Sequence, residues 1–291
     1  ILPAWADQIF IMNSNYNSNA NVTNVTSHAE AAGHTVTSAD SYPSDVSSYN
    51  QIWDMRYPDA LSSSEITKLK TVLENGGTVY LTGEHSGLAE RNNSITSFIQ
   101  DVGGGSAAVG SGGSIHTQFV ESAFRTPNNI TEVRLGGGGF FSNLGNGTAI
   151  TKNSSGTEPA TAVWYDSDLS ASYPGKIIVV LDINIFSNST YYDNEGYDNP
   201  KFLENLVALA ETSQAPTISS AALASDNTYI DVTMSAAVYN AIGGSDALEA
   251  TDFTLTFAQN SGSATAASIS SVKQNDDTAE ASATALAGGE T

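Results

Sequence analysis

The sequence predicts an α/β domain with a mostly parallel sheet covered by helices on both faces, followed by a smaller β-sandwich domain. Two observations support this prediction. Over residues 7–211, short apolar runs alternate with segments of helical periodicity, which is the pattern of repeated strand–helix–strand units. From residue 217 onward the helical pattern ends, and short segments alternate between apolar and polar residues as half-buried strands do.

The first strand–helix–strand unit begins with the apolar run QIFIM at residues 8–12, which has the pattern of a buried parallel strand. This run ends in the polar segment 13–17, where we expect a loop that faces a ligand. Residues 20–32 predict a helix that stops at Gly33, and residues 34–37 predict the second strand.

The same pattern repeats further along the chain. Residues 51–55 and 78–82 predict two more strands. The helix between these strands is expected to begin at Ser62, which can form a capping box with Glu65, and to run to Glu74.

The rest of the first domain contains one irregular stretch. A helix is predicted over residues 93–102, and the most apolar strand of the chain over residues 176–182. Residues 106–168 between them are rich in glycine, so we expect an inserted antiparallel or loop region beside the sheet. Residues 200–210 predict a closing helix with Pro200 in its first turn.

The C-terminal segment reads as the beginning of a β-sandwich. Residues 217–221, 229–234 and 253–257 alternate as short strands. These strands are too few to form two packed sheets, so we expect the domain over residues 217–291 to be incomplete. Residues 212–216 are expected to link it to the first domain.

The chain is strongly acidic. It has 10 Lys and Arg residues and 31 Asp and Glu residues. The resulting net charge of −21 would repel nucleic acid and anionic membrane surfaces. The absence of cysteine excludes disulfides, thiolate metal sites and Cys nucleophiles. Residues 1–6 end in Ala-x-Ala, like the remnant of a secretory signal peptide, and no long apolar stretch follows. We therefore expect a secreted or cell-surface protein without a membrane span.

One family resemblance rests on the turn Gly83-Glu84-His85-Ser86-Gly87, on the opening strand, and on residues 177–182 followed by 198–206. With these features, residues 7–211 resemble the class I glutamine amidotransferase-like domain, which is flavodoxin-like. The enzymes of that family carry a Cys at the centre of the turn. His85 stands there in this chain, so the resemblance implies a domain that is not a glutamine amidotransferase.

A second resemblance rests on the segment APTISSAALASDNTYIDVTMSAAVYN and on ALEATDFTLTF, which follows it. These segments resemble the Ig-like repeats of large bacterial surface and swimming-associated proteins. The resemblance implies an adhesive or spacer role for residues 217–291, without catalytic residues.

The candidate catalytic residues are Glu84, His85, Ser86 and Asp182. All four follow or end predicted strands, and the carboxyl ends of parallel strands form the edge where ligands bind in open α/β sheets. Carboxylates and an imidazole at that edge suit general acid–base chemistry. In the alternative interpretation, Glu84 and His85 only fix the turn through hydrogen bonds to the backbone.

Further residues are candidates for binding a ligand or a metal. Ligand contacts are expected from the first loop, from the end of the third strand and from the irregular region, namely Asn13, Asn15, Asp54, Arg56 and His116. Oxygen ligands around Gly196, supplied by Asp193, Glu195 and Asp198, suit Ca²⁺, although their spacing is not that of an EF-hand. An ordinary polar loop before Pro200 is the alternative.

Together these features predict an exported, modular cell-surface protein. Its first domain is expected to be a non-catalytic binding or structural module displayed on Ig-like repeats, with an extracellular glycan, a small molecule or a protein as ligand. The alternative is an extracellular hydrolase with a site around Glu84, His85 and Asp182.

Overall fold

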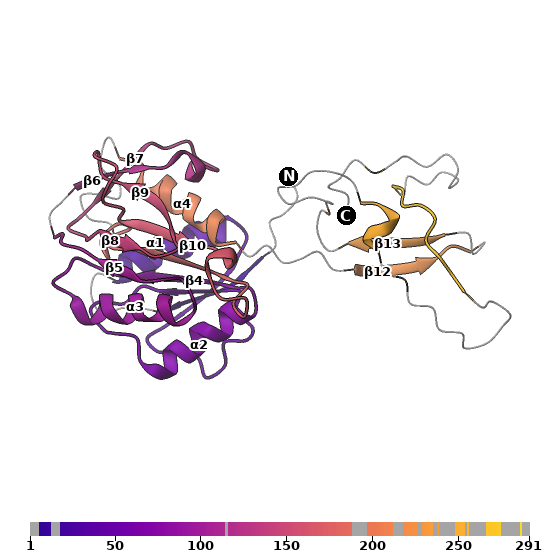
Figure 1. Ribbon diagram of the computed structural model, residues 1–291, viewed down its shortest axis with the longest axis horizontal. Coiled ribbons are helices and arrows are strands. Elements are labelled where there is room, and N and C mark those ends of the chain that lie inside the picture. Colours follow the sequence, from indigo (N-terminus) through magenta and orange to yellow (C-terminus); the bar gives the residue numbers. More distant parts are fainter. Residues whose placement is uncertain are drawn as a thin grey trace. The chain divides into compact units, whose positions relative to one another are not determined.

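The chain forms two compact units, Ile1–Thr212 (unit 1) and Ser213–Thr291 (unit 2), which are visible in the computed structural model (Figure 1). The described residues are 6–12, 18–113, 116–187, 197–211, 218–225, 229–234, 238, 248–253, 255, 266–274 and 286.

Unit 1 is built on a nine-stranded sheet. Its strands are β1 (Gln8–Met12), β2 (Thr35–Ala39), β3 (Gln51–Asp54), β4 (Thr78–Thr82), β6 (His116–Val120), β7 (Glu132–Leu135), β9 (Thr148–Lys152), β10 (Thr161–Trp164) and β11 (Lys176–Val180). They lie in the order β2-β1-β3-β4-β11-β10-β9-β6-β7.

This sheet is mixed rather than mostly parallel, which corrects the expectation from the sequence. Neighbouring strands from β2 to β11 are parallel, whereas those from β11 to β7 are antiparallel. Residues 106–168 do not form an insertion beside the sheet, because they supply four of its strands, β6, β7, β9 and β10. These strands are only four or five residues long, so their apolar alternation is short and glycine-rich turns obscure it.

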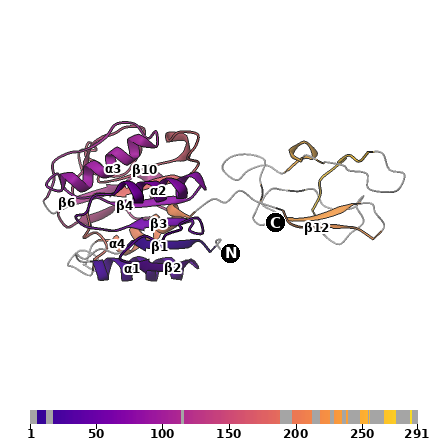
Figure 2. The same cartoon turned by 90° about the horizontal axis from the view of Figure 1, so that it is seen from below.

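Four helices cover the sheet, two on each face (Figure 2). They are α1 (Ser18–Ala31), α2 (Ser63–Glu74), α3 (Ala89–Asp101) and α4 (Asn199–Ala210). One buried cluster joins α1 and α4 to the sheet, and a second cluster joins α2 and α3 to the opposite face. A short ribbon of β5 (Ala107–Val109) and β8 (Phe141–Leu144) lies on the α3 side.

Local sequence explains where α2 and α4 begin. The predicted capping box between Ser62 and Glu65 is present at the start of α2, and Pro200 lies in the first turn of α4. Helix α3 begins at Ala89 rather than at residue 93. Its first turns carry the polar residues Arg91 and Asn92, which are buried, so the apolar pattern of this helix starts late.

Short 3-10 helices complete the described structure, η1 (Ser122–Phe124), η2 (Asp166–Asp168) and η3 (Ala250–Asp252). Within the described residues, no helix has the length and apolar character needed to cross a membrane.

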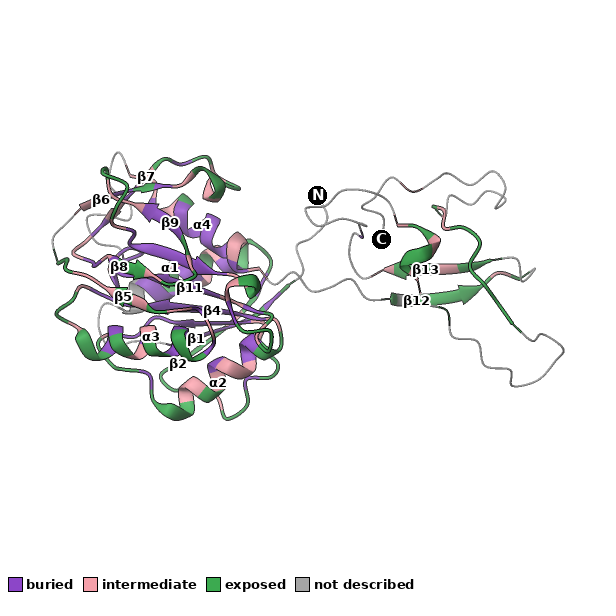
Figure 3. Cartoon of the chain, in the orientation of Figure 1, coloured by how far each residue is buried: buried purple, intermediate pink, exposed green. Residues whose placement is uncertain are grey.

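The described part of unit 2 contains one antiparallel pair of strands, β12 (Ile218–Leu223) and β13 (Ile230–Met234). The ribbon of β12 is coloured as exposed in Figure 3. Large apolar side chains of the pair are among the exposed ones, including Leu223 and Ile230. Of the third predicted strand, Phe253 and Leu255 are described and are not in a strand. Within the described part of unit 2, this strand pair is what the structure shows of the expected Ig-like β-sandwich, and two packed sheets are not seen there.

Candidate functional site

The register of the sheet brings Glu84 and Asp182 together. Strands β4 and β11 are parallel neighbours in which Thr82 pairs with Val180. Two residues beyond this pair, Glu84 and Asp182 leave the same carboxyl edge of the sheet, where ligands bind in open α/β sheets. Both side chains are buried, with exposed fractions of 5% for Glu84 and 0% for Asp182.

The carboxylate of Glu84 joins the loops that follow β4 and β11. Its Oε1 accepts a hydrogen bond from the backbone N–H of Ile183 at 3.0 Å, and its Oε2 accepts one from the backbone N–H of His85 at 3.1 Å. Burial raises the pKa of Glu84 above its ordinary value, although these two backbone donors act in the opposite direction.

The carboxylate of Asp182 is held in the same way. Its Oδ1 accepts from the backbone N–H of Asn184 at 2.8 Å, and its Oδ2 accepts from the backbone N–H of Gly136. Burial, and next the negative charge of Glu84, raise the pKa of Asp182 to about 7. Asp182 is therefore a buried acid that exchanges its proton near neutral pH.

His85 and Ser86 lie in the loop between β4 and α3. The imidazole Nδ1 of His85 accepts a hydrogen bond from the backbone N–H of Gly87 at 3.0 Å. Ser86 is exposed, and within the described residues it makes no hydrogen bond to His85. The arrangement of a serine nucleophile held by a histidine base is therefore not formed by these two neighbours.

Asn92 fixes this loop, and sequence reasoning did not find it. From the first turns of α3, its side-chain oxygen accepts from the backbone N–H of Glu84 at 3.0 Å, and its nitrogen donates to the carbonyls of Glu84 and His85. A buried asparagine near the start of a helix carries no signal in the sequence that separates it from an exposed one.

The glycine run from Gly136 to Gly139 crosses the same edge, which the sequence also did not reveal. A Cβ atom on Gly138 would lie 2.0 Å from the carbonyl oxygen of Leu181, and one on Gly139 would lie 2.7 Å from the carbonyl oxygen of Glu84. Glycine is required at both positions, because the backbone passes in direct contact with the ends of β4 and β11.

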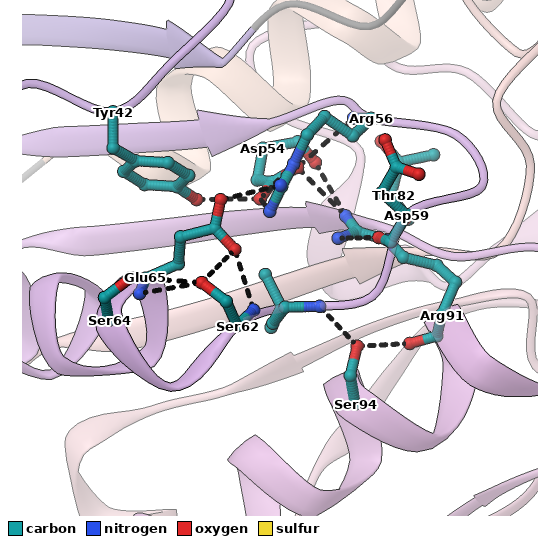
Figure 4. Close-up of polar contacts among 11 residues, drawn as sticks. Tyr42, Asp54, Arg56, Asp59, Ser62, Ser64, Glu65, Thr82, Arg91 and Ser94 are labelled. Carbon is teal, nitrogen blue, oxygen red and sulfur yellow. Dashed lines mark hydrogen bonds and ion pairs between the residues drawn. The ribbon is translucent and has the colours of Figure 1, made fainter.

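Asp54 and Arg56, predicted as ligand contacts, belong to a closed network on the α2–α3 face (Figure 4). The Oδ2 of Asp54 accepts from Arg56 at 2.6 Å and from the hydroxyl of Tyr42 at 2.7 Å, while its Oδ1 accepts from Arg91 at 3.1 Å. Arg56 also donates to Glu65 at 2.7 Å.

This network stabilises the ionised form of Asp54. Burial alone would raise the pKa of Asp54, but Arg91 and Arg56 outweigh burial and lower the pKa to about 2. Asp54 and Arg56 are both buried and hydrogen-bonded within the protein, where they join β3 to α2 and α3.

The remaining predicted residues are placed as follows. His116 begins β6, where it pairs with Leu135 directly before the glycine run. Asp198 is paired with Lys201 at 3.0 Å. The others lie outside the described residues, namely Asn13, Asn15, Asp193 and Glu195. In the part of the chain that the structure describes, no three acidic or histidine side chains are grouped to hold a metal ion.

Comparisons with known proteins show the fold of unit 1 and nothing finer. No protein-family model and no curated protein matches the chain. Among solved structures, the N-terminal domain of mmIFT52 is similar with a TM-score of 0.55 and 15% identity, over 71% of this chain and 98% of that domain. The cytoplasmic protein STM3548 from Salmonella typhimurium is similar with a TM-score of 0.51 and 11% identity, over 71% of this chain and 99% of that protein.

A ThuA-like protein from Bacteroides uniformis is also similar, with a TM-score of 0.46 and 14% identity, over 71% of this chain and 91% of that protein. These findings overturn the resemblance drawn from the sequence. The structural similarity of unit 1 is to the mmIFT52 N-terminal domain, and no family model, whether of an amidotransferase or of an Ig-like repeat, matches the chain. The chain therefore contains an α/β unit with the fold of the mmIFT52 N-terminal domain.

Proposed function

We propose that unit 1 is a non-catalytic binding module of an exported cell-surface protein. One observation carries the proposal: all four oxygens of the Glu84 and Asp182 carboxylates accept hydrogen bonds from backbone N–H groups, which belong to His85, Ile183, Gly136 and Asn184. Carboxylates that hold loops together are occupied in a structural task and are poorly placed to attack a substrate.

The topology supports a ligand at this edge. Counted along the chain, the five parallel strands β1, β2, β3, β4 and β11 follow the order 2-1-3-4-5. That order is the one of flavodoxin-like sheets, which bind their ligands beyond the carboxyl ends of the strands. The candidate ligands are an extracellular glycan, a small molecule or a protein, and the net charge of −21 disfavours nucleic acid.

A hydrolase remains the second candidate, because one observation favours it. The pKa of Asp182 is raised to about 7 beside the buried Glu84, and an acid with that pKa is suited to proton transfer at neutral pH.

One experiment separates the two candidates. The purified chain is incubated with ester, phosphoester and glycoside substrates, and in parallel it is tested for binding to arrays of glycans and extracellular proteins. Binding without turnover supports the module. Turnover that disappears in Asp182→Ala and His85→Ala, while the circular dichroism spectrum stays native, overturns it in favour of the hydrolase.

A further inference from the structure

The hydrogen bond to His85 determines which of its ring nitrogens carries the proton. The backbone N–H of Gly87 points at Nδ1 from 3.0 Å, so Nδ1 must offer a lone pair. A neutral imidazole with a lone pair at Nδ1 carries its hydrogen at Nε2. The Nε2 nitrogen of His85 is therefore a donor.

This tautomer excludes two roles for Nε2. A general base and a metal ligand both use a lone pair at Nε2, which requires the hydrogen at Nδ1. A histidine that ligates a metal normally donates its other N–H to an acceptor. At His85, Nδ1 faces a donor, the N–H of Gly87. If Nε2 bound a metal ion or accepted a proton, Nδ1 would carry a hydrogen, and this hydrogen would point at the hydrogen of the Gly87 N–H.

Glycines from two separate segments, at positions 87 and 139, leave the room that His85 needs in this orientation, whereas a Cβ atom on Gly113 would be in ordinary contact with its ring. A Cβ atom on Gly87 would lie 2.6 Å from the ring atom Cε1, and one on Gly139 would lie 2.9 Å from the Cα of His85. A Cβ atom on Gly113 would lie 3.6 Å from the ring atom Cγ, which is ordinary contact. Side chains at 87 and 139 would displace His85, so the glycines create its position.

The Nε2–H of His85 is left for a ligand. Within the described residues Nε2 has no hydrogen-bond partner, and the residue is half-buried at the carboxyl edge. Its surroundings are acidic, since Glu84 precedes it, Asp182 lies at the same edge, and the chain carries a net charge of −21. An anionic ligand would be repelled at this place, whereas an uncharged oxygen would be accepted.

We infer that His85 is a hydrogen-bond donor, through Nε2, to an uncharged oxygen acceptor of the ligand. The inference rests on the proposed binding function, and it names the chemistry of one contact. A neutral oligosaccharide carries such oxygens at high density and is therefore the ligand class that we expect.

The first test needs no ligand. In the full ¹⁵N-labelled chain, which has only 4 histidines, the His85 signals are assigned by their loss in His85→Gln. The expected spectrum has a pyridine-type nitrogen at Nδ1 and a pyrrole-type nitrogen at Nε2. A hydrogen at Nδ1 in the neutral ring, or loss of the Nε2 hydrogen on addition of Zn²⁺, would overturn the inference.

The second test uses two probes, the neutral maltoheptaose and the acidic tetragalacturonate. Maltoheptaose is expected to shift the Nε2–H signal and to bind about tenfold more weakly to His85→Leu, as for the loss of one hydrogen bond. His85→Gln, which keeps an N–H near the position of Nε2, and the control His28→Gln are expected to retain binding within about threefold. Gly87→Ala is expected to weaken binding as His85→Leu does.

The outcomes separate the inference from the proposed function. Failure of maltoheptaose to bind, equal binding by His85→Leu, or tighter binding of tetragalacturonate overturns the inference, even if another ligand confirms a binding module. Hydrolysis of maltoheptaose by the wild-type chain overturns the proposed function, whereas the tautomer of His85 is measured independently of it.

Discussion

The substitution Asp54→Asn tests whether the network of Figure 4 stabilises unit 1. It removes one buried negative charge and keeps the side-chain volume. Arg91 and Arg56, with exposed fractions of 1% and 8%, then remain buried beside an uncharged amide. Breaking a buried ion pair from one side costs about 3–5 kcal/mol, because the partner charge stays desolvated. We expect the free energy of unfolding of unit 1 to fall by this amount at pH 7.

The pH dependence of unfolding gives an independent measure of how much the ionised Asp54 stabilises unit 1. The folded pKa of Asp54 is about 2, below the unfolded value of 3.8, so its ionisation stabilises the protein above the unfolded value. This stabilisation is lost as the pH falls from about 4 through 2, and two pKa units correspond to about 3 kcal/mol. The difference between the wild-type protein and Asp54→Asn is therefore expected to narrow over this pH range.

Urea unfolding of the full chain, followed by tryptophan fluorescence, measures this change. Trp53 and Trp164 are completely buried, and every tryptophan of the chain belongs to unit 1, so the signal reports unit 1 alone. The control is Asp101→Asn, whose carboxylate pairs with Lys70 but is 57% exposed, with an expected loss below about 1 kcal/mol. An equally small loss in Asp54→Asn would refute the reasoning.

Three further predictions concern the carboxyl edge. Gly138→Ala is expected to lower the free energy of unfolding by about 1–3 kcal/mol in urea titrations, because its Cβ atom would overlap the carbonyl of Leu181. Asn92→Ala leaves buried backbone groups of Glu84 and His85 without partners and is expected to cost about 3 kcal/mol by the same measurement. For Asp182, the folded pKa of about 7 exceeds the unfolded value of 3.8, so its contribution to stability is fully present below pH 4 and is lost as the pH rises through 7. Thermal unfolding between pH 5 and 8 should show this decline in the wild-type protein and a flatter profile in Asp182→Asn; parallel profiles would contradict the assignment.

The parts of the fold that the sequence predicted have strong local signals. The strands β3 and β4 have apolar, completely buried centres, Ile52-Trp53 and Val79-Tyr80-Leu81, and the capping box of Ser62 and Glu65 identifies the start of α2. The strands β6 and β7 have no such signal, since polar residues interrupt both of them and glycine-rich segments precede β6 and follow β7. Their pairing in one sheet with β11 depends on contacts between distant segments, which local patterns do not encode.

In the candidate site, too, residues with a local sequence signal were predicted, and residues that act through distant contacts were not. Glu84 and Asp182 were predicted at one edge because each follows a strand that is readable in the sequence, and the register of β4 and β11 accounts for their proximity. The groups that hold them were not predicted. The N–H of Gly136 and the amide of Asn92 act through contacts across 46 and 8 residues of chain, and neither contact leaves a pattern near Glu84 or Asp182.

Two buried carboxylates of unit 1 differ in how the protein balances their charge, and this difference bears on function. Asp54 lies against two arginines, so it stays ionised and its pKa falls to about 2. Among the described residues, no lysine or arginine pairs with Asp182, which lies buried near Glu84 and accepts hydrogen bonds from Gly136 and Asn184, and its pKa rises to about 7. Asp182 therefore supplies a change of protonation near neutral pH at the carboxyl edge. If a ligand is bound there through His85, its affinity should change more between pH 6 and 8 in the wild-type protein than in Asp182→Asn, whereas a site elsewhere on unit 1 would show the same pH profile in both.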